Sequence, residues 1–204
     1  MEPLETPIGA PFFFQLECDA PRWTDRFEKK HLLPQLGRLF GEEAFTEVSL
    51  AWSETGLHFF VEVQDAEQGE GGAGENSVEL FIDTKNVKNA RTTHRFCHHF
   101  LITPERISGV QSKEITRFRT EDKHALSLPD ELDVKTKINS SGYTLEITIP
   151  ERCLTGYQPE VGGSIGFQYR IHRSKKSSQH FGISTNNCNF ELYPYLWNSV
   201  KLAK

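Results

Sequence analysis

The chain has 204 residues, of which 37% are hydrophobic and 25% charged, and its formal net charge at neutral pH is −5. This composition excludes collagen-like, coiled-coil and fully disordered proteins, and the length favours one compact domain. No window approaches the roughly 18 to 20 consecutive apolar residues of a membrane helix, and the acidic start lacks the basic residues of a signal peptide. We therefore expect a cytoplasmic protein that does not bind membranes.

The N-terminal part of the chain holds the one helical candidate. Residues 24–33 are compatible with a helix, which Pro34 would stop. We expect residues 1–44 to be an N-terminal extension that packs on a core formed by residues 45–202. Because no linker-like segment separates two cores, residues 1–204 are predicted to form a single domain.

Two-residue alternation of apolar side chains dominates after this extension and predicts β-strands. Residues 48–52 and 57–63 form two such runs, and Gly56 lies in the short turn between them, which indicates a hairpin. The alternation places Trp52 in the core. A polar, glycine-rich stretch at residues 68–75 follows, for which we expect a flexible loop.

The next strand carries different chemistry on its two faces. Val78, Leu80 and Ile82 alternate with polar or aromatic neighbours, so Glu79 is predicted to point away from the core. Residues 95–103 are typical of a strand that is covered on both faces. Further strands are predicted at residues 106–110, 115–119, 133–138, 143–149, 163–171 and 196–202.

Short strands separated by turn signals indicate an antiparallel sandwich or barrel. Residues 139–142 are rich in turn formers and predict a second hairpin, which Pro150 ends. The apolar positions of the strands predict one shared core, formed by Val48, Leu50, Phe59, Val61, Val78, Leu80, Leu145, Ile147, Ile165 and Phe167.

Charge is distributed unevenly along the chain. Residues 1–83 contain 17 acidic and 5 basic side chains, whereas residues 84–204 contain 11 acidic and 18 basic ones. The basic cluster at residues 170–176 would be the centre of any nucleic-acid surface. The chain is acidic overall, however, and charge runs are usually solvated loops, so we expect no nucleic-acid partner.

The cysteines and histidines are candidate metal ligands. The four cysteines are far apart and include no C-x-x-C pair, which favours free thiols. Cys97 and His99 share one face of a predicted strand and His94 is near, but a zinc site would need more ligands, such as His124 or His172. Nothing in the sequence requires these residues to converge, so no metal site is predicted. The chain also lacks a G-x-S-x-G elbow, and no catalytic residue is assigned.

Five segments, in this order and spacing, resemble the family 9 carbohydrate-binding modules and the related DOMON-like sandwiches. The most characteristic is Glu75-Asn-Ser-Val-Glu-Leu-Phe-Ile-Asp-Thr84. The likeness extends over roughly residues 45–202, and its other segments are residues 48–65, 142–150, 163–167 and 196–202. The resemblance implies an antiparallel β-sandwich that binds the ends of sugar chains without catalysis, and that holds structural calcium in some members.

The resemblance also indicates where a sugar would bind. Glu79 matches the acidic residue that faces the family's site, and His99 and Arg170 fall where the family places polar ligands. The two tryptophans that clamp a sugar in the family are not present at the matching positions. His180 and Phe181 would offer a weaker stacking surface, so we expect an affinity no better than about 1 mM.

These observations lead to one favoured function and two alternatives. The fold expected is all-β, an antiparallel β-sandwich with jelly-roll or immunoglobulin-like layers and at most two or three short helices. The favoured function is non-catalytic carbohydrate binding at a site that has partly degenerated, with no cofactor apart from the calcium implied by the family. The alternatives are a protein-protein interaction module that uses the same face and, less favoured, a metal-dependent hydrolase built around Cys97, His99 and Glu79.

Overall fold

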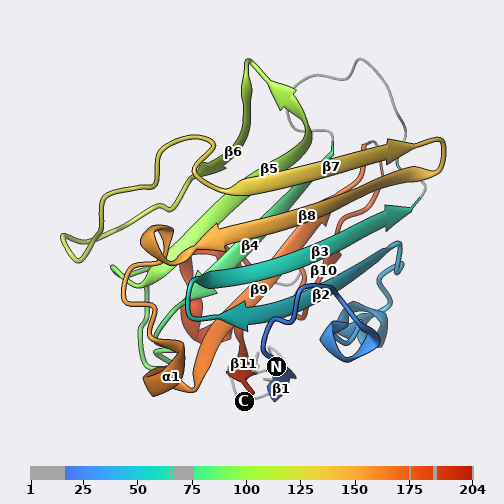
Figure 1. The fold of residues 1–204 in the computed structure, drawn as a ribbon. Helices are drawn as coiled ribbons and strands as arrows, with labels where there is room; N and C mark the ends of the chain where they lie inside the picture. The colour runs from blue at the N-terminus through green and yellow to red at the C-terminus, as the bar shows by residue number, and fades with distance from the viewer. Residues whose placement is uncertain (1–16, 65, 67–75, 175, 186–187, 204) are drawn as a thin grey trace, which may run out of the picture.

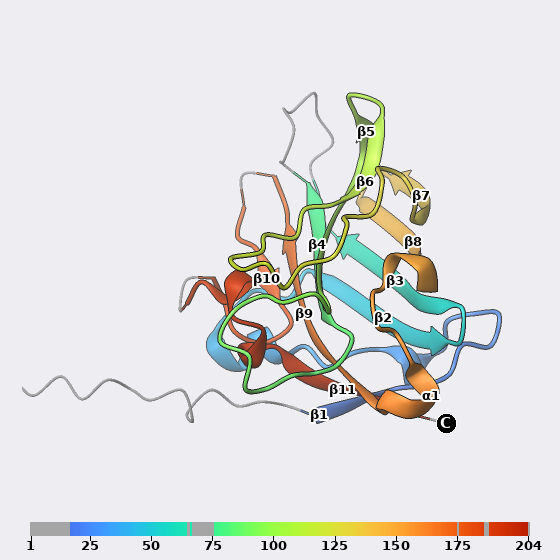
Figure 2. The same cartoon turned by 90° about the vertical axis from the view of Figure 1, so that its left-hand side faces the viewer.

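Two β-sheets pack face to face and form the body of the protein (Figure 1). The two layers are distinct in the rotated view (Figure 2) and do not close into a barrel. The predicted sandwich is confirmed, since 45% of residues lie in strands and 11% are helical. Among the helices described, none is long and apolar enough to span a bilayer. The computed structural model describes residues 17–64, 66, 76–174, 176–185 and 188–203, so the loop predicted at residues 68–75 lies outside the described residues.

The smaller sheet has four antiparallel strands in the order β2-β3-β8-β7. They are β2 (Thr46–Ser53), β3 (Gly56–Gln64), β7 (Asp133–Asn139) and β8 (Gly142–Pro150). Both predicted hairpins are present, β2 with β3 and β7 with β8. A Cβ atom at Gly56, where φ is 149°, would lie 2.1 Å from the carbonyl oxygen of Ile149. Only glycine therefore fits at the start of β3.

The larger sheet has the strand order β1-β11-β9-β4-β5-β6, and β10 also pairs with β9. β1 is parallel to its neighbour β11, whereas the other pairs are antiparallel. Its strands are β1 (Glu17–Ala20), β4 (Ser77–Asp83), β5 (Cys97–Ile107), β6 (Val110–Glu114), β9 (Ser164–His172), β10 (Gln179–His180) and β11 (Asn198–Leu202). The sequence analysis did not predict β1, which joins the N-terminal part of the described chain to this sheet.

The strands predicted at residues 106–110 and 115–119 are wrong, because β5 ends at Ile107, a turn follows, and β6 ends at Glu114. The backbone N–H of Ile115 still donates to the carbonyl of His99 at 2.7 Å. The N–H of His99, however, donates to the side-chain Oγ1 of Thr116 at 2.8 Å instead of to a backbone carbonyl. This side chain interrupts the backbone ladder, and residues 115–132 continue as a segment without regular structure (Figure 1).

The helix predicted at residues 24–33 is also wrong, since only Lys29–His31 form a 3-10 turn there. The backbone N–H of Trp23 donates to the carbonyl of Trp52 at 2.7 Å, and that of Leu33 to the carbonyl of Val48 at 2.8 Å. Both ends of the segment are therefore hydrogen-bonded to β2, which prevents a continuous helix. The described chain has one short α-helix, α1 (Pro159–Gly162), and four other 3-10 turns: Leu36–Phe40, Glu151–Cys153, Phe190–Leu192 and Pro194–Leu196.

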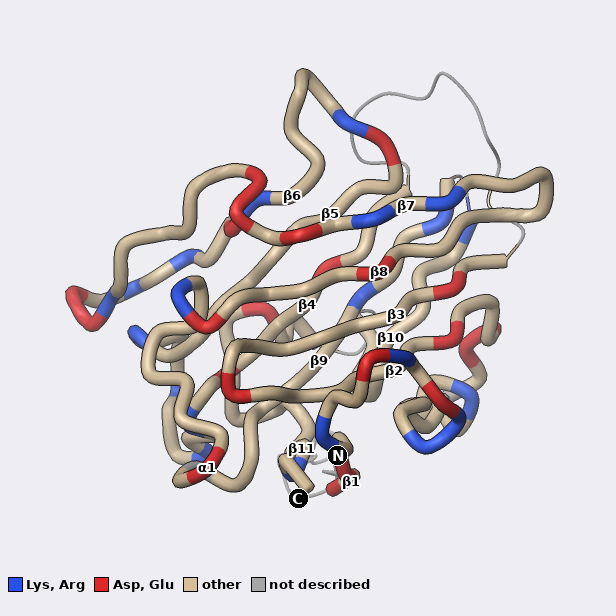
Figure 3. Tube along the Cα trace, viewed as in Figure 1, with Lys and Arg blue, Asp and Glu red and all other residues tan. Residues whose placement is uncertain are grey.

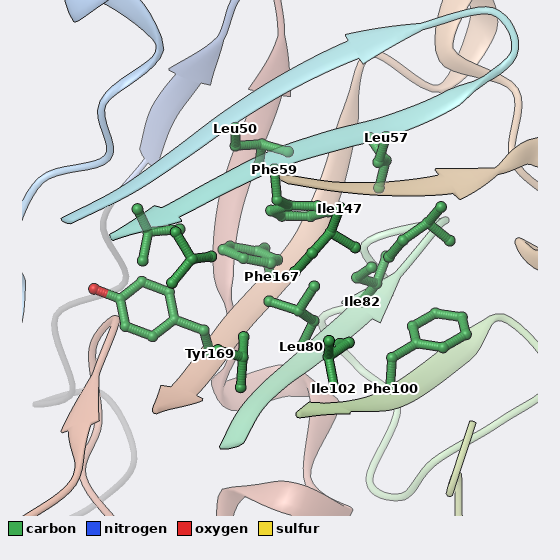
Figure 4. Packing of buried hydrophobic residues seen from close by; sticks show 14 of the residues in the cluster. Leu50, Leu57, Phe59, Leu80, Ile82, Phe100, Ile102, Ile147, Phe167 and Tyr169 are labelled. Carbon is green, nitrogen blue, oxygen red and sulfur yellow. The ribbon is translucent and has the colours of Figure 1, made fainter. Parts of the chain in front are cut away.

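The main hydrophobic core fills the space between the two sheets (Figure 4). All ten predicted core residues belong to it. The rings of Phe59 from one sheet and Phe167 from the other are stacked, with centroids 5.6 Å apart. Trp52 is also fully buried, as predicted, and its indole Nε1 donates to the carbonyl of Ala203 at 2.8 Å. This core fixes which face of each strand points outward.

A second hydrophobic cluster covers the outer face of the larger sheet. It consists of Phe81, Cys97, Ile183, Phe190, Leu196 and Trp197. Most of it comes from the chain between β10 and β11, which folds back over β4 and β5. Every residue of β4 is consequently buried, including those that point away from the main core.

Acidic and basic residues are mixed over the folded chain (Figure 3). Within the basic cluster of the sequence, Arg173 forms an ion pair with Glu43 at 2.8 Å and Arg170 pairs with Glu79 at 2.7 Å. Both arginines thus bind carboxylates from the acidic first part of the chain. The uneven charge of the sequence is therefore partly explained by ion pairs between its two parts.

The core assignment predicts that matched leucines differ in their effect on stability. Leu50 is fully buried, whereas Leu39 is 78% exposed. We expect Leu50→Ala to lower the free energy of unfolding by about 2 to 5 kcal/mol, because it leaves a cavity between the sheets. Leu39→Ala should change it by less than about 0.5 kcal/mol. Urea denaturation of both variants measures this, and equal losses would contradict the core described above.

Candidate functional site

A buried carboxylate network lies on the outer face of the larger sheet. Glu79 is at the centre of β4, opposite Arg170 of β9, and its side chain is 7% exposed. Arg170 donates from Nε to Oε1 at 2.8 Å and from Nη2 to Oε2 at 2.7 Å. His99 Nε2 lies 2.7 Å from Oε2, and His172 Nε2 lies 3.1 Å from Oε1. Both carboxylate oxygens are therefore used twice within the protein.

The structure thus brings together three of the predicted site residues, Glu79, His99 and Arg170. It adds a second carboxylate, since Arg170 Nη1 donates to Glu191 Oε1 at 2.6 Å. Phe81 forms an apolar floor, with its ring stacked 4.0 Å from that of His99 and 5.9 Å from the guanidinium carbon. The guanidinium is held between two carboxylates above an aromatic ring.

The charges of this network stabilise one another. Burial alone would raise the pKa of Glu79, but hydrogen bonds from His172, His99 and Arg170 hold that pKa well below its usual range. Burial likewise disfavours the charged form of Arg170, while Glu79 and Glu191 raise its pKa above the ordinary value. Glu79 is therefore a carboxylate, and Arg170 a cation, at any physiological pH.

Little space is left beside this network. The adjoining pocket, lined by His99, Thr116, Glu191 and Trp197 among others, has a volume of about 10 Å³, enough for about one water molecule. A groove of about 210 Å³ lies on the outer face of the smaller sheet instead, where it is lined by Trp23, Phe27, His58, Lys135 and Glu146 among others. Of these two pockets, the one beside the Glu79 network is much the smaller.

The other two predicted site residues are not hydrogen-bonded members of this network, although His180 is directly opposite Arg170 in the pairing of β10 with β9. His180 is 2% exposed, and its Nδ1 lies 2.8 Å from Glu42 Oε1. Phe181 is fully buried in the main core, where its ring stacks on that of Tyr169 with centroids 5.5 Å apart. The short strand β10 pairs with β9, and the N–H of Phe181 donates to the carbonyl of Tyr169 at 3.3 Å. This pairing turns the Phe181 ring inward, so it presents no surface to a ligand.

Sequence reasoning missed two members of the network for different reasons. His172 is two residues from Arg170 on β9 and so shares its face, a signal that strand periodicity could have supplied. Glu191 belongs to the 3-10 turn Phe190–Leu192, within an irregular segment whose path no short-range pattern encodes.

The residues proposed for a hydrolase do not form one metal-binding group. Among the described residues, Cys97 clusters with Asp83 and His94, while His99 is bound to Glu79. Burial and the charge of Asp83 raise the pKa of Cys97 well above its usual range, so it remains a thiol. None of the four cysteines is in a disulfide.

The calcium implied by the resemblance does not fit this cluster. Calcium takes six to eight oxygen ligands. The cluster offers one carboxylate, an imidazole and a sulfur, and Asp83 already accepts the backbone N–H groups of Lys85 and Val87. The donor set is therefore unsuitable for calcium.

Comparison with known proteins identifies the family. The family model described as "Carbohydrate family 9 binding domain-like" matches residues 35–198. The chain belongs to this family. No curated protein sequence gives a match.

Two solved structures of family 9 modules share the fold. One is a module from Caldicellulosiruptor kristjanssonii in complex with cellotriose, with a TM-score of 0.63 and 15% identity, covering 91% of this chain and 93% of that one. The other is a family 9 module from the same organism in complex with glucose, with a TM-score of 0.61 and 16% identity, covering 92% of this chain and 95% of that one. At such low identity the likeness concerns the sandwich fold alone.

The buried network predicts that stability depends on the charge of Glu79. Because its folded-state pKa is depressed, Glu79 should contribute stability above about pH 4.5, and this contribution should be lost as the pH falls further. Glu79→Gln should therefore cost about 3 kcal/mol at pH 7, because Arg170 loses its buried carboxylate partner. The difference from the wild type should shrink below about pH 4.

Urea denaturation at several pH values tests this. Glu47→Gln is the matched control, because Glu47 is an exposed carboxylate on β2, and it should change little at any pH. A Glu79→Gln variant as stable as the wild type at pH 7 would show that the network does not support the fold.

Proposed function

We propose that this protein is a non-catalytic carbohydrate-binding module whose site, on the outer face of the larger sheet, is degenerate. The convergence of Glu79, His99 and Arg170 supports this proposal most strongly. A carboxylate that accepts and a guanidinium that donates can together bind neighbouring hydroxyls of a sugar. The family 9 modules with this fold include one bound to cellotriose and one bound to glucose.

Three features support a weak site. The hydrogen-bonding groups of Arg170 and Glu79 already bind one another and their neighbours within the protein. The adjoining pocket of about 10 Å³ is far too small for a pyranose ring. Phe181 lies in the core and provides no stacking face. A sugar must therefore displace internal contacts, and we expect a dissociation constant of about 1 mM or weaker, about −4 kcal/mol.

The protonation state of the network supports a non-catalytic role. A glycosidase needs a carboxylic acid whose pKa is raised, so that it can protonate the leaving group. The pKa of Glu79 is instead held well below its usual range. Glu191, the other carboxylate at this site, is bound to the same guanidinium. Neither side chain is placed as a general acid.

NMR titration with glucose and cellotriose tests the proposal. At tens of millimolar sugar, shifts should appear around Glu79, His99 and Arg170, and they should be lost in Glu79→Gln. Glu191→Gln should bind up to about tenfold more tightly, because it frees one N–H of the guanidinium from a charged partner. Glu47→Gln should bind like the wild type, and circular dichroism confirms that each variant is folded.

Two results would contradict this function. Shifts confined to Trp23 and Phe27 would place sugar binding in the groove of the smaller sheet. No shifts at all would instead favour a protein-protein interaction module that uses the same face.

A further inference from the structure

Two imidazoles and a carboxylate converge at one end of the larger sheet, on the opposite side of β5 from His99. They are His98 of β5, Glu114 at the end of β6, and His124 of the irregular segment 115–132. His98 Nδ1 lies 3.0 Å, and His124 Nε2 2.8 Å, from the same oxygen, Oε1 of Glu114. All three side chains are buried: His98 is 1% exposed, His124 7% and Glu114 0%. The three potential ligand atoms lie within 4.8 Å of one another.

The hydrogen bonds around His124 orient its ring toward Glu114. Its Nδ1 lies 2.7 Å from the carbonyl of Arg95, which can only accept, so Nδ1 carries the proton. In a neutral ring, Nε2 then presents a lone pair to the carboxylate at 2.8 Å. Two lone pairs repel at this distance, so a positive charge is required between them, either a second proton on His124 or a metal ion.

Three side chains lie within hydrogen-bond distance of Glu114 Oε1. It accepts the Thr116 hydroxyl at 2.7 Å in addition to facing the two imidazoles. Its other oxygen, Oε2, accepts the backbone N–H of Ser127 at 2.8 Å. Three side chains therefore converge on one oxygen of a buried carboxylate.

We propose that His98, Glu114 and His124 bind one divalent transition-metal ion of the zinc type. Two imidazole nitrogens and one carboxylate oxygen are a common zinc donor set, whereas calcium and magnesium prefer oxygen alone. In a tetrahedral zinc site the ligand atoms are about 3.3 Å apart, so the two imidazole nitrogens need to move away from Oε1 of Glu114 by only a few tenths of an ångström. Water or the Thr116 hydroxyl completes the coordination.

The surrounding groups resemble the outer shell of a metal site. The Arg95 carbonyl fixes the ring nitrogen of His124 that faces the ion, and Ser127 and Thr116 hold the carboxylate. Bound metal would tie the segment 115–132 to β5 and β6. The role is therefore structural, and it is independent of whether the outer face of the sheet binds sugar.

Zinc alone is the probe for this site. The full chain, stripped with EDTA and dialysed, should bind one Zn²⁺ tightly in calorimetry and by elemental analysis. Its melting temperature should rise with zinc concentration. Co²⁺ should give the intense visible absorption of a tetrahedral site. His124→Ala should weaken zinc binding by at least about 100-fold. Removing a residue that only hydrogen-bonds to a metal ligand typically lowers metal affinity by no more than about 100-fold, so a larger loss indicates a direct ligand.

His58→Ala is the matched control, since His58 is a half-buried histidine on the other sheet and should leave zinc binding unchanged. Glu114→Gln gives a second variant with the same expected loss. Imidazole ¹⁵N shifts provide a readout that does not depend on variants, because Nε2 of His124 should lose its proton when zinc is added. The proposal would be overturned if zinc does not bind stoichiometrically, if His124→Ala binds zinc as well as the wild type, or if the His124 ring stays doubly protonated in zinc. The cluster would then be an ion pair between His124 and Glu114.

Discussion

The burial of Glu79 is the constraint on which the outer face of the larger sheet depends. β4 alternates between the main core and a second covered face, so a carboxylate in the middle of this strand is removed from water on both sides. A buried charge is tolerated only when it is paired and hydrogen-bonded. This requirement is met by Arg170, His99 and His172, which contact both oxygens of Glu79. Glu191 accepts a further hydrogen bond from the guanidinium of Arg170. The network therefore supports the fold, and the same contacts occupy the groups that would bind a ligand.

The sandwich core and a sugar site place different demands on the sequence. The sandwich requires only apolar residues of suitable size between the sheets, and many sequences satisfy that condition. A sugar site requires open space and a few polar groups in fixed positions. Around Glu79 the polar groups are present, but Trp197 and its neighbours fill the space above β4. Because the two demands fall on different residues, a sequence can keep the sandwich at 15% identity with a solved family 9 module.

Much of the fold was predictable because it depends on local periodicity. The alternation around Val78 and Glu79 correctly assigned the two faces of β4, and Gly56 marked a hairpin turn. The network of Glu79, His99 and Arg170 follows from that assignment once β5 and β9 pair with β4. The family resemblance supplied this pairing, which no single strand encodes.

The errors arise where long-range contacts decide the outcome. The segment at residues 24–33 has helical composition, but hydrogen bonds to β2 fix its ends. Phe181 was expected to face a ligand, and the pairing of β10 with β9 turns it into the core. The convergence of His98, Glu114 and His124 could not be predicted either, because it depends on the path of an irregular segment.

A crystal structure of the protein soaked with cellotriose at tens of millimolar would test the central claim most directly. The account predicts partial sugar density beside Glu79, with hydroxyls near His99 and Arg170 that replace some of the internal contacts of Glu79 and Arg170. Fully occupied sugar seated on a different surface, with the Glu79 network unchanged, would contradict it.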